Sequence, residues 1–239
     1  MMAASQTLAF HHTQPRFSWG VTNYSPRRLA RLLAFLDDGS RTFGWDPLLT
    51  FDDAYESFYT HAAPLLLKYH FKSRVFAPSR YLGRRNSWDY ASRLAPVRHL
   101  TAPQLLELDA QGFDVQSHGH RHCDLTELPD QELATELETA KAALEDVLGR
   151  EVSELCYPYG RVNPRVEAAA QAAGFARGWS LDPAHRGPFT FGRWGVYAFD
   201  TPLTVRAKLN GGLTARMEYC KVRLTNTAGR AGRFAFWTD

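Results

Sequence analysis

The sequence alternates short apolar runs with longer amphipathic stretches from residue 46 onward, and this alternation restricts the fold more than any other feature. Short apolar runs, which predict strands, lie at 46–54, 73–79, 113–119, 153–160, 175–180 and 191–198. Stretches with apolar residues at helical spacing lie at 56–70, 101–112, 129–149, 163–174 and 201–212, the last being the final helix that we expect. Strands that alternate with helices form βαβ units around a parallel sheet. The sequence therefore predicts an α/β fold.

The stretch 129–149 is the clearest of these helices. Its apolar residues repeat at helical spacing, and Gly149 is a typical helix stop; the repeating residues are Leu133, Leu137, Ala140, Leu144 and Val147. The chain has no internal repeat, low-complexity segment or linker, and α/β barrels of about its length often form one unit. We expect a single domain over residues 1–239.

The charge of the chain argues against nucleic-acid binding. The formal net charge is only +3, and 44% of the residues are hydrophobic, which is ordinary for a globular protein. Arginine pairs at 27–28 and 84–85 are not accompanied by a basic stripe with interleaved aromatic residues. We expect no nucleic-acid partner, although Arg84 or Arg85 could meet a phosphate on an anionic substrate.

The cysteines and the beginning of the sequence indicate a cytoplasmic protein. Cys123, Cys156 and Cys220 are odd in number and irregularly spaced, which fits no disulfide framework. The first residues lack the basic and apolar regions of a signal peptide, and no run approaches the ~20 apolar residues of a membrane helix. We therefore expect a cytoplasmic location and no membrane span.

Polar residues cluster where three of the predicted strands end. Asp52 and Asp53 follow the apolar run 48–51, Ser117 and His118 end the next-but-one strand, and the segment 157–160 (YPYG) ends another. In parallel α/β folds the carboxyl ends of the strands meet at one edge, where active sites form. These three clusters therefore predict one shared site.

The segment 115–125 contains the residue types of a metal site. Imidazole and carboxylate groups are ordinary ligands of zinc, and a turn or short helix would bring His118 and His122 to one side. His120 would then point elsewhere. One aspartate of the 52–53 pair could instead cap the following helix, but this explains only one of the two.

Three motifs in this chain resemble those of the polysaccharide deacetylases with a NodB homology domain. They are TFDD at 50–53, SHGHRH at 117–122 and YPYG at 157–160, and the resemblance runs from about residue 48 to about residue 209. The family's enzymes use a metal to remove N- or O-acetyl groups from sugars. The resemblance implies a distorted (β/α) barrel, which we expect to have seven strands.

The resemblance also implies a role for each motif residue. Asp53, His118 and His122 correspond to the metal ligands, and Asp52 corresponds to the general base that takes a proton from the attacking water. The backbone amide of Tyr159 corresponds to the donor that stabilises the oxyanion. The implied cofactor is a divalent metal, with Zn²⁺ preferred and Co²⁺ or Ni²⁺ as alternatives.

Two positions depart from the family pattern. Many members have arginine, which orients the base, where this chain has Tyr157. Arg193 is the candidate substitute, with a plain surface salt bridge as the equal alternative. Ala54 stands where relatives usually have glycine, and we expect the extra methyl to be tolerated.

A third departure concerns the histidine that protonates the leaving group. The family's leucine-x-histidine motif lies near the C-terminus, but this chain has no histidine after Asp200 and has LAFHHT at 8–13 instead. This arrangement resembles a circularly rearranged subset that includes biofilm poly-N-acetylglucosamine deacetylases, so residues 1–47 would supply a rearranged N-terminal strand and helix. His11 is then the expected general acid, with His12 as its rival, and a partly ordered tail is the alternative.

The substrate is the least constrained feature. Trp88, in the segment 80–90, is a candidate for stacking on a sugar ring, and Tyr157 is a second substrate-binding candidate, although surface packing would explain either. The leading hypothesis is a metal-dependent hydrolase that removes an acetyl group from an N-acetylated carbohydrate. The alternatives are another C–N hydrolase, such as a deformylase or a cyclic amidase, and a non-catalytic sugar-binding relative.

Overall fold

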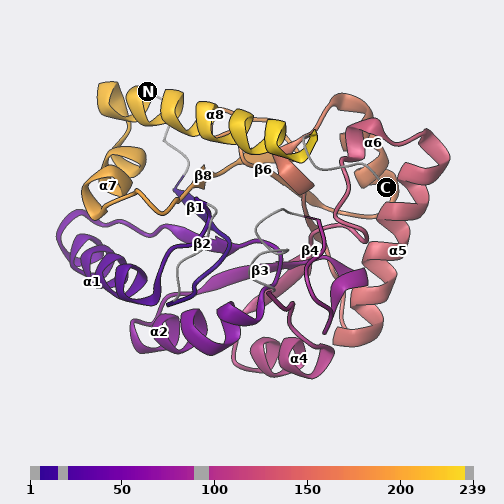
Figure 1. The fold of residues 1–239 in the computed structure, drawn as a ribbon, viewed down its shortest axis with the longest axis horizontal. Coiled ribbons are helices and arrows are strands. Elements are labelled where there is room, and N and C mark those ends of the chain that lie inside the picture. Colours follow the sequence, from indigo (N-terminus) through magenta and orange to yellow (C-terminus); the bar gives the residue numbers. More distant parts are fainter. Residues whose placement is uncertain (1–5, 16–20, 89–96, 235–239) are drawn as a thin grey trace.

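The computed structural model of this chain describes residues 6–15, 21–88 and 97–234, with residues 226–234 described by their backbone alone. Its centre is an all-parallel sheet (Figure 1) with the strand order β7-β6-β5-β4-β3-β2-β1-β8. The strands are β1 (Thr7–Phe10), β2 (Leu48–Phe51), β3 (Ser73–Ala77), β4 (Asp114–Ser117), β5 (Glu154–Cys156), β6 (Arg177–Ser180), β7 (Thr190–Gly192) and β8 (Trp194–Gly195).

The strand count is eight instead of the seven expected. The apolar run 191–198, which predicted one strand, contributes to both β7 and β8, and these two strands lie at opposite ends of the strand order. Arg193 alone separates them, so the chain passes from one edge of the sheet to the other through a single residue. The eight strands form a nearly closed barrel.

Helices lie between most of the strands. They are α1 (Pro26–Phe43), α2 (Ala63–Lys68), α4 (Ala102–Ala110), α5 (Asp130–Leu148), α6 (Pro164–Ala172), α7 (Pro202–Asn210) and α8 (Gly212–Phe234). A π-helical turn at Phe58–Ala62 leads into α2, and short 3₁₀ turns lie at Ser79–Tyr81, Leu125–Glu127 and Pro158–Gly160. The stretch predicted as one helix at 56–70 is therefore a π-helical turn followed by a short α-helix.

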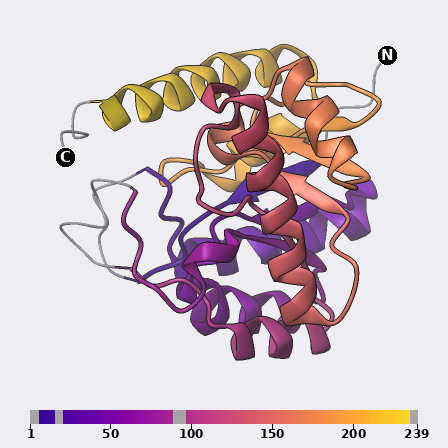
Figure 2. The ribbon, with the colours of Figure 1, turned by 90° about the vertical axis from the view of Figure 1, so that its right-hand side faces the viewer.

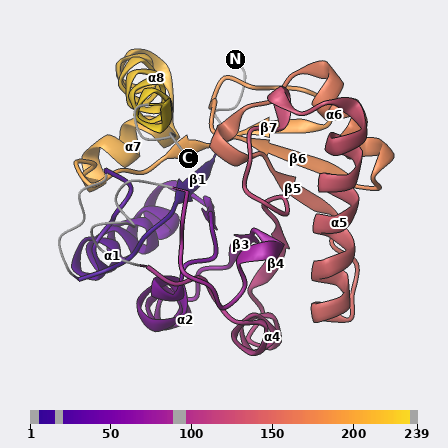
Figure 3. The same cartoon turned by 45° about the vertical axis from the view of Figure 1, so that its right-hand side comes forward.

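The helices pack on the outside of the strands, as Figure 3 shows for α1, α2, α4, α5 and α6. Helix α1 buries Leu29, Leu32, Leu33 and Leu36, whose spacing puts them on one face. Helix α5, the long helix that faces the viewer in Figure 2, ends at Gly149 with φ 65° as predicted. Most of the buried apolar residues form one large core, and Phe76, Cys156 and Trp179 form a second, smaller cluster.

The prediction that 201–212 contains the last helix is wrong, because α8 follows α7 directly. In α8, Ala215 and Val222 are buried in the core and Tyr219 packs against it, so the residues that attach this helix repeat at helical spacing. None of the helices in the described part of the chain is both long and apolar enough to cross a membrane.

The N-terminal segment supplies an inner strand of the sheet. β1 pairs in parallel with β2 on one side and with β8 on the other, and its four residues are buried. Helix α1 then connects β1 to β2, so the expected N-terminal strand and helix are both present. This placement brings the residue after β1, His11, to the same edge as the ends of β2, β4 and β5.

Candidate active site

The residues of the three motifs meet at the carboxyl ends of neighbouring strands. Asp52 and Asp53 follow β2, His118 follows β4, and the segment 157–160 follows β5. Because all strand pairs are parallel, these ends lie at one edge of the sheet. The polar clusters of the sequence therefore do form one site.

Asp53, His118 and His122 converge as a candidate metal-binding group. Asp53 Oδ1 lies 3.4 Å from His118 Nε2 and 3.1 Å from His122 Nε2. All three side chains are buried, and their nearest ligand atoms lie within 4.8 Å of one another. This is a compact set of one carboxylate and two imidazoles.

Contacts outside this group orient the two imidazoles. His118 Nδ1 donates to the carbonyl oxygen of Cys156 at 2.8 Å, which leaves Nε2 directed at Asp53. The His122 ring packs edge-on against Tyr159 and stacks on Trp88, with ring centroids 4.7 and 4.0 Å apart. The Tyr159 hydroxyl also donates to the His122 carbonyl at 3.2 Å. Both histidines are therefore held in place by the protein.

The segment from His118 to His122 is not the turn or short helix that its spacing suggested. It is an irregular loop in which Gly119 has φ 78° and His122 has φ 54°. Asp53 (φ 69°) and Tyr159 (φ 58°) also have left-handed backbones, although neither is a glycine. Such conformations cost about 1–2 kcal/mol each and gather at functional sites.

The group fits a divalent metal ion. Asp53 Oδ1 is buried and accepts no hydrogen bond from the described residues, although two imidazole nitrogens lie close to it. Burial alone would raise the pKa of Asp53, but His122 and His118 outweigh it and hold that pKa well below its usual range. Carboxylate and imidazole donors with one open position are typical of catalytic zinc. A cation held between the three ligands would satisfy the buried oxygen.

Asp52 forms a buried pair with Arg193. Arg193 Nη1 donates to Asp52 Oδ1 at 2.7 Å and Nη2 donates to Oδ2 at 2.8 Å, and Nη1 also donates to Thr50 Oγ1 at 2.8 Å. Arg193 is 0% exposed, so the alternative of a surface salt bridge is wrong. Burial raises the pKa of Asp52, but the guanidinium outweighs it and lowers that pKa overall. Asp52 is therefore an oriented, ionised carboxylate.

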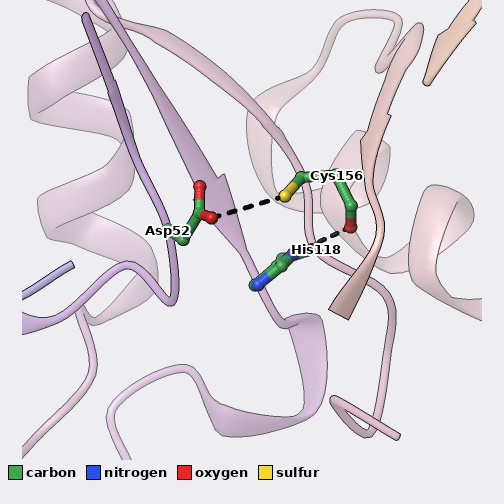
Figure 4. A group of neighbouring side chains, drawn as sticks. All are labelled: Asp52, His118 and Cys156. Atoms are coloured by element: carbon green, nitrogen blue, oxygen red, sulfur yellow. Dashed lines mark hydrogen bonds between the residues drawn. The ribbon is translucent and has the colours of Figure 1, made fainter. Parts of the chain in front are cut away.

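Cys156 belongs to the same site, which the sequence did not indicate. Figure 4 shows Asp52, His118 and Cys156 facing one another. Cys156 Sγ lies 3.6 Å from Asp52 Oδ2 and accepts a hydrogen bond from Arg193 Nη2 at 2.8 Å. Burial raises the pKa of Cys156, so it remains a neutral thiol. Asp52, His118 and Cys156 are close enough to form a second possible metal-binding group, but the Arg193 guanidinium already supplies a positive charge there. The group of Asp53, His118 and His122 is therefore the metal candidate.

His11 and His12 take different positions. His11 Nε2 lies 3.9 Å from Asp52 Oδ2, and its side chain is 16% exposed. His12 is buried, stacks on Tyr55 with ring centroids 3.8 Å apart, and has a pKa lowered to about 3 by burial. A histidine with that pKa is neutral near pH 7 and is unsuited to donating a proton there. Of the two rivals, only His11 lies beside the carboxylate.

The sequence model of the family described as "Polysaccharide deacetylase" matches residues 47–178, more than half of the chain. This chain belongs to the polysaccharide deacetylase family. YxkH of Bacillus subtilis (strain 168), which is named for the same family, is 29% identical over 136 residues. The match covers 57% of this chain but 44% of YxkH, so the matched region is less than half of that relative.

Solved structures show the same fold. The Streptococcus pyogenes deacetylase PplD in complex with acetate has a TM-score of 0.70 and 20% identity, covering 85% of this chain and 96% of PplD. IcaB from Ammonifex degensii has a TM-score of 0.68 and 21% identity, with the same coverage of both chains. The predicted distorted (β/α) barrel of the polysaccharide deacetylases is thus confirmed, apart from the strand count.

One of the two predicted substrate contacts is not accessible. Tyr157 is 0% exposed, and its hydroxyl pairs with Thr190 Oγ1 at 3.0 Å. Its ring lies where a side chain at Gly178 would be, since a Cβ there would come within 2.3 Å of the hydroxyl. The assignment of Tyr157 to substrate binding is therefore wrong, because the side chain is fully buried in the main hydrophobic core.

The other predicted substrate contact, Trp88, lies beside the candidate metal-binding group of Asp53, His118 and His122. Its half-buried ring stacks on His122, and its backbone amide donates to Asn86 Oδ1 at 3.1 Å. Residues 89–90, at the end of the expected substrate loop, lie outside the described residues. One face of Trp88 is therefore already occupied by a candidate ligand.

Two further residues of the site were not predicted from the sequence. Glu136 on α5 bonds to the His118–His122 loop, and His99 Nδ1 donates to the Asp53 carbonyl at 2.7 Å. A signal for Glu136 was present, because it lies at helical spacing from Leu133 and Ala140 on the buried face of α5. His99 carries no comparable signal in its neighbouring residues.

Proposed function

We propose that this chain is a metal-dependent hydrolase that removes an acetyl group from an N-acetylated carbohydrate. The observation that carries the proposal is the Asp53, His118 and His122 group beside the Asp52–Arg193 pair. Membership of the polysaccharide deacetylase family supports the same reaction. The expected ion is Zn²⁺, with Co²⁺ or Ni²⁺ as alternatives, and the cytoplasmic location stays a prediction.

The side chains of the site can divide the work of amide hydrolysis. A divalent ion held by Asp53, His118 and His122 would supply Lewis acidity toward the acetyl carbonyl and a lowered pKa for an adjacent water. Asp52, held in its ionised form by Arg193, takes a proton from the attacking water. The backbone amide of Tyr159 is proposed to donate to the carbonyl oxygen as negative charge develops on it.

The leaving amine requires a proton when the carbon–nitrogen bond breaks. His11, whose Nε2 lies 3.9 Å from Asp52 Oδ2, is proposed as the donor. The products are then acetate and the free amine of the sugar, and the proton taken by Asp52 can return through His11. The proposed acid, His11, and the proposed base, Asp52, therefore lie next to each other, so that one proton can pass from Asp52 to His11 in each turnover.

Metal content is the first test of the proposal. We expect nearly one metal ion per chain in the wild type by elemental analysis, and almost none in His118→Ala. His120→Ala is the matched control, because His120 Nδ1 bonds to Ser79 Oγ at 2.8 Å and not to the candidate ligands. A wild-type protein that binds no ion after loading with zinc, cobalt or nickel would overturn the proposed mechanism.

Product analysis distinguishes the remaining hydrolases. We expect acetate release from N-acetylglucosamine oligomers by the wild type, and none by Asp52→Asn with its metal retained. Formate release from N-formyl sugars would favour a deformylase, and ring opening of a cyclic amide without acetate release would favour an amidase. Sugar binding without any of these products would support the non-catalytic relative.

A further inference from the structure

We propose that Glu136 is a positioning residue that holds the loop between His118 and His122 in its ligand-presenting shape and thereby sets the metal affinity of the site. Glu136 lies on α5, outside the candidate ligand group. The inference rests on the proposed function in so far as it requires the site to bind a metal. It adds a residue that acts through the loop backbone and not on the substrate.

Glu136 makes three hydrogen bonds to this loop, and both of its carboxylate oxygens take part. Oε1 accepts from the backbone amides of His120 and Arg121, at 2.8 and 2.6 Å. Oε2 accepts from Arg121 Nε at 2.8 Å. The two amides lie between the two ligand histidines in the sequence, so this carboxylate is fastened to the middle of the loop.

On the opposite side, the loop is held by two backbone hydrogen bonds and by the contact of Ser79 Oγ with His120 Nδ1 at 2.8 Å. The amide of Ser79 donates to the carbonyl of Gly119, and the amide of Arg80 donates to the carbonyl of His120, both at 3.1 Å. The loop is therefore held from one side through its carbonyls and from the other through its amides. Of the two attachments, the one through the loop amides is made by the Glu136 side chain, whereas the one through the loop carbonyls is made by backbone amides.

Gly119 lies in the loop beside Glu136. Its φ is 78°, and a Cβ at this position would lie 3.4 Å from Glu136 Oε1 and 3.6 Å from Pro158 Cγ. Both are ordinary van der Waals distances, so the positive φ, and not a lack of space, favours glycine at this position of the loop.

Packing does not explain a glutamate at this position. Glu136 is 2% exposed and shares the buried face of α5 with Leu133, Leu137 and Ala140. Burying a carboxylate is unfavourable unless hydrogen bonds and a counter-charge compensate it, and here the loop provides both. Arg121 also has an exposed partner, Glu132, at 3.8 Å, so the guanidinium does not need a buried one.

The orientation of His122 depends on the loop backbone. His122 Nδ1 is buried and has no hydrogen-bond partner among the described residues, in contrast to His118 Nδ1. Aromatic contacts and the φ 54° backbone therefore hold the His122 ring. A shift of the loop would move His122 away from Asp53 while His118 stays at the end of β4. Loss of groups that orient metal ligands typically weakens metal binding roughly 10–100-fold.

The test compares Glu136→Gln with Glu132→Gln, its matched control on the same helix. The first measurement is hydrogen exchange at the amides of His120 and Arg121 in metal-free protein, which reports on the loop without any ion. The second is Zn²⁺ affinity by competition with a chelator. We expect Glu136→Gln to lose protection at both amides and to bind Zn²⁺ roughly 10–100-fold more weakly, while Glu132→Gln matches the wild type.

Each outcome separates this inference from the proposed function. Wild-type affinity in a folded Glu136→Gln, or unchanged exchange at both amides, would overturn the positioning role and leave the hydrolase intact. A wild type that binds no Zn²⁺ would overturn both. Should Glu136→Gln fail to fold, Arg121→Gln removes the bond to Glu136 Oε2 together with the exposed contact to Glu132, and we expect several-fold weaker Zn²⁺ binding. Wild-type affinity in that variant would also overturn the inference.

Discussion

Arg193 is a fully buried cation whose partners are a carboxylate, a hydroxyl and a thiol. Its bidentate contact with Asp52 fixes the plane of that carboxylate and stabilises its ionised form. A lysine has the same charge but only one nitrogen, so it cannot bind both oxygens in this way. Substitution of Arg193 by lysine can therefore separate the effect of a neighbouring positive charge on Asp52 from the effect of a fixed orientation.

We predict that Arg193→Lys lowers kcat by about 10- to 100-fold, because a small misplacement of a reacting group is sufficient for a loss of that size. Metal content should stay at the wild-type level, since Arg193 does not contact the Asp53 group. Arg193→Met should instead destabilise the fold by about 3–5 kcal/mol, because Asp52 would be left buried without its partner. Steady-state kinetics and urea unfolding measure the two effects, and wild-type kcat in the lysine variant would contradict the orienting role.

The two N-terminal histidines should behave differently when they are replaced. We expect His11→Ala to lower kcat by about 100-fold or more while the metal is retained, as for a general acid. His12→Ala should reduce the free energy of unfolding by about 1–3 kcal/mol through lost packing on Tyr55, with kcat nearly unchanged. The opposite pattern would assign the acid role to His12.

Sequence motifs predicted that the candidate ligand and base residues lie close together, since each motif directly follows a strand, and the structure brings them to one edge of the sheet. Cys156 and Glu136 were missed because their roles depend on contacts between distant segments. Glu136 meets His120 across 16 positions, and Cys156 meets Asp52 across 104. Tyr157 was misassigned for a related reason, because the sequence does not show that its ring packs over Gly178 in the core.

At the scale of elements, α7, α8 and β8 are joined by one buried ionic cluster. Lys208 Nζ on α7 donates to Asp200 Oδ2 at 2.7 Å and to the Gly195 carbonyl of β8 at 2.8 Å. Lys221 on α8 donates to the other oxygen of Asp200 at 3.3 Å. The cluster adds an ionic attachment of α8 to the apolar one that Ala215 and Val222 provide.

We predict that Asp200→Asn reduces the free energy of unfolding by about 3–5 kcal/mol at pH 7, because Lys208 would remain buried and uncompensated. Burial raises the pKa of Asp200, but Lys208 outweighs it, so the folded-state pKa lies below the usual value of about 4. The carboxylate therefore contributes stability above pH ~4, and this contribution is lost as the pH falls through the lower, folded-state pKa. Urea unfolding from pH 7 to pH 3 should show the two proteins converging at low pH, and a difference that does not depend on pH would contradict this.

Most elements could be predicted because apolar spacing and helix caps are local signals. Thr101, for example, caps α4 through a capping box with Gln104, as its position before an apolar stretch suggested. β7 and β8 were merged because a two-residue strand has no period of its own. The π-helical turn before α2 could not be predicted either, since the stretch 56–70 has helical spacing throughout.

At the scale of the whole molecule, the part of the chain that matches the family model is not the whole barrel. Residues 47–178 lack β1, β7 and β8 as well as Arg193 and His11. β1 lies between β2 and β8, and Leu8, Ala9 and Phe10 in it are 0% exposed. The fold class could be predicted from the alternating pattern, but the position of β1 inside the sheet followed only from the resemblance to the rearranged subset.

We predict that a chain beginning at residue 47 does not fold, because β2 would lose a neighbouring strand and α1 would no longer cover the core. Circular dichroism and limited proteolysis should show a loss of helix signal and rapid cleavage compared with the full chain. Addition of a separate peptide of residues 1–46 should restore part of the protection. A truncated chain with a cooperative thermal transition would contradict this prediction.

The single residue between β7 and β8 links turnover to the closure of the barrel. A chain in which β8 has not yet paired with β1 would keep its other helices and its Asp53 group, yet its Asp52 would lack the guanidinium that orients it. Such a molecule would bind metal and look native by circular dichroism while remaining inactive. Acetate release is therefore a more sensitive report of barrel closure than any measure of secondary structure, and during refolding it should recover after the helix signal does.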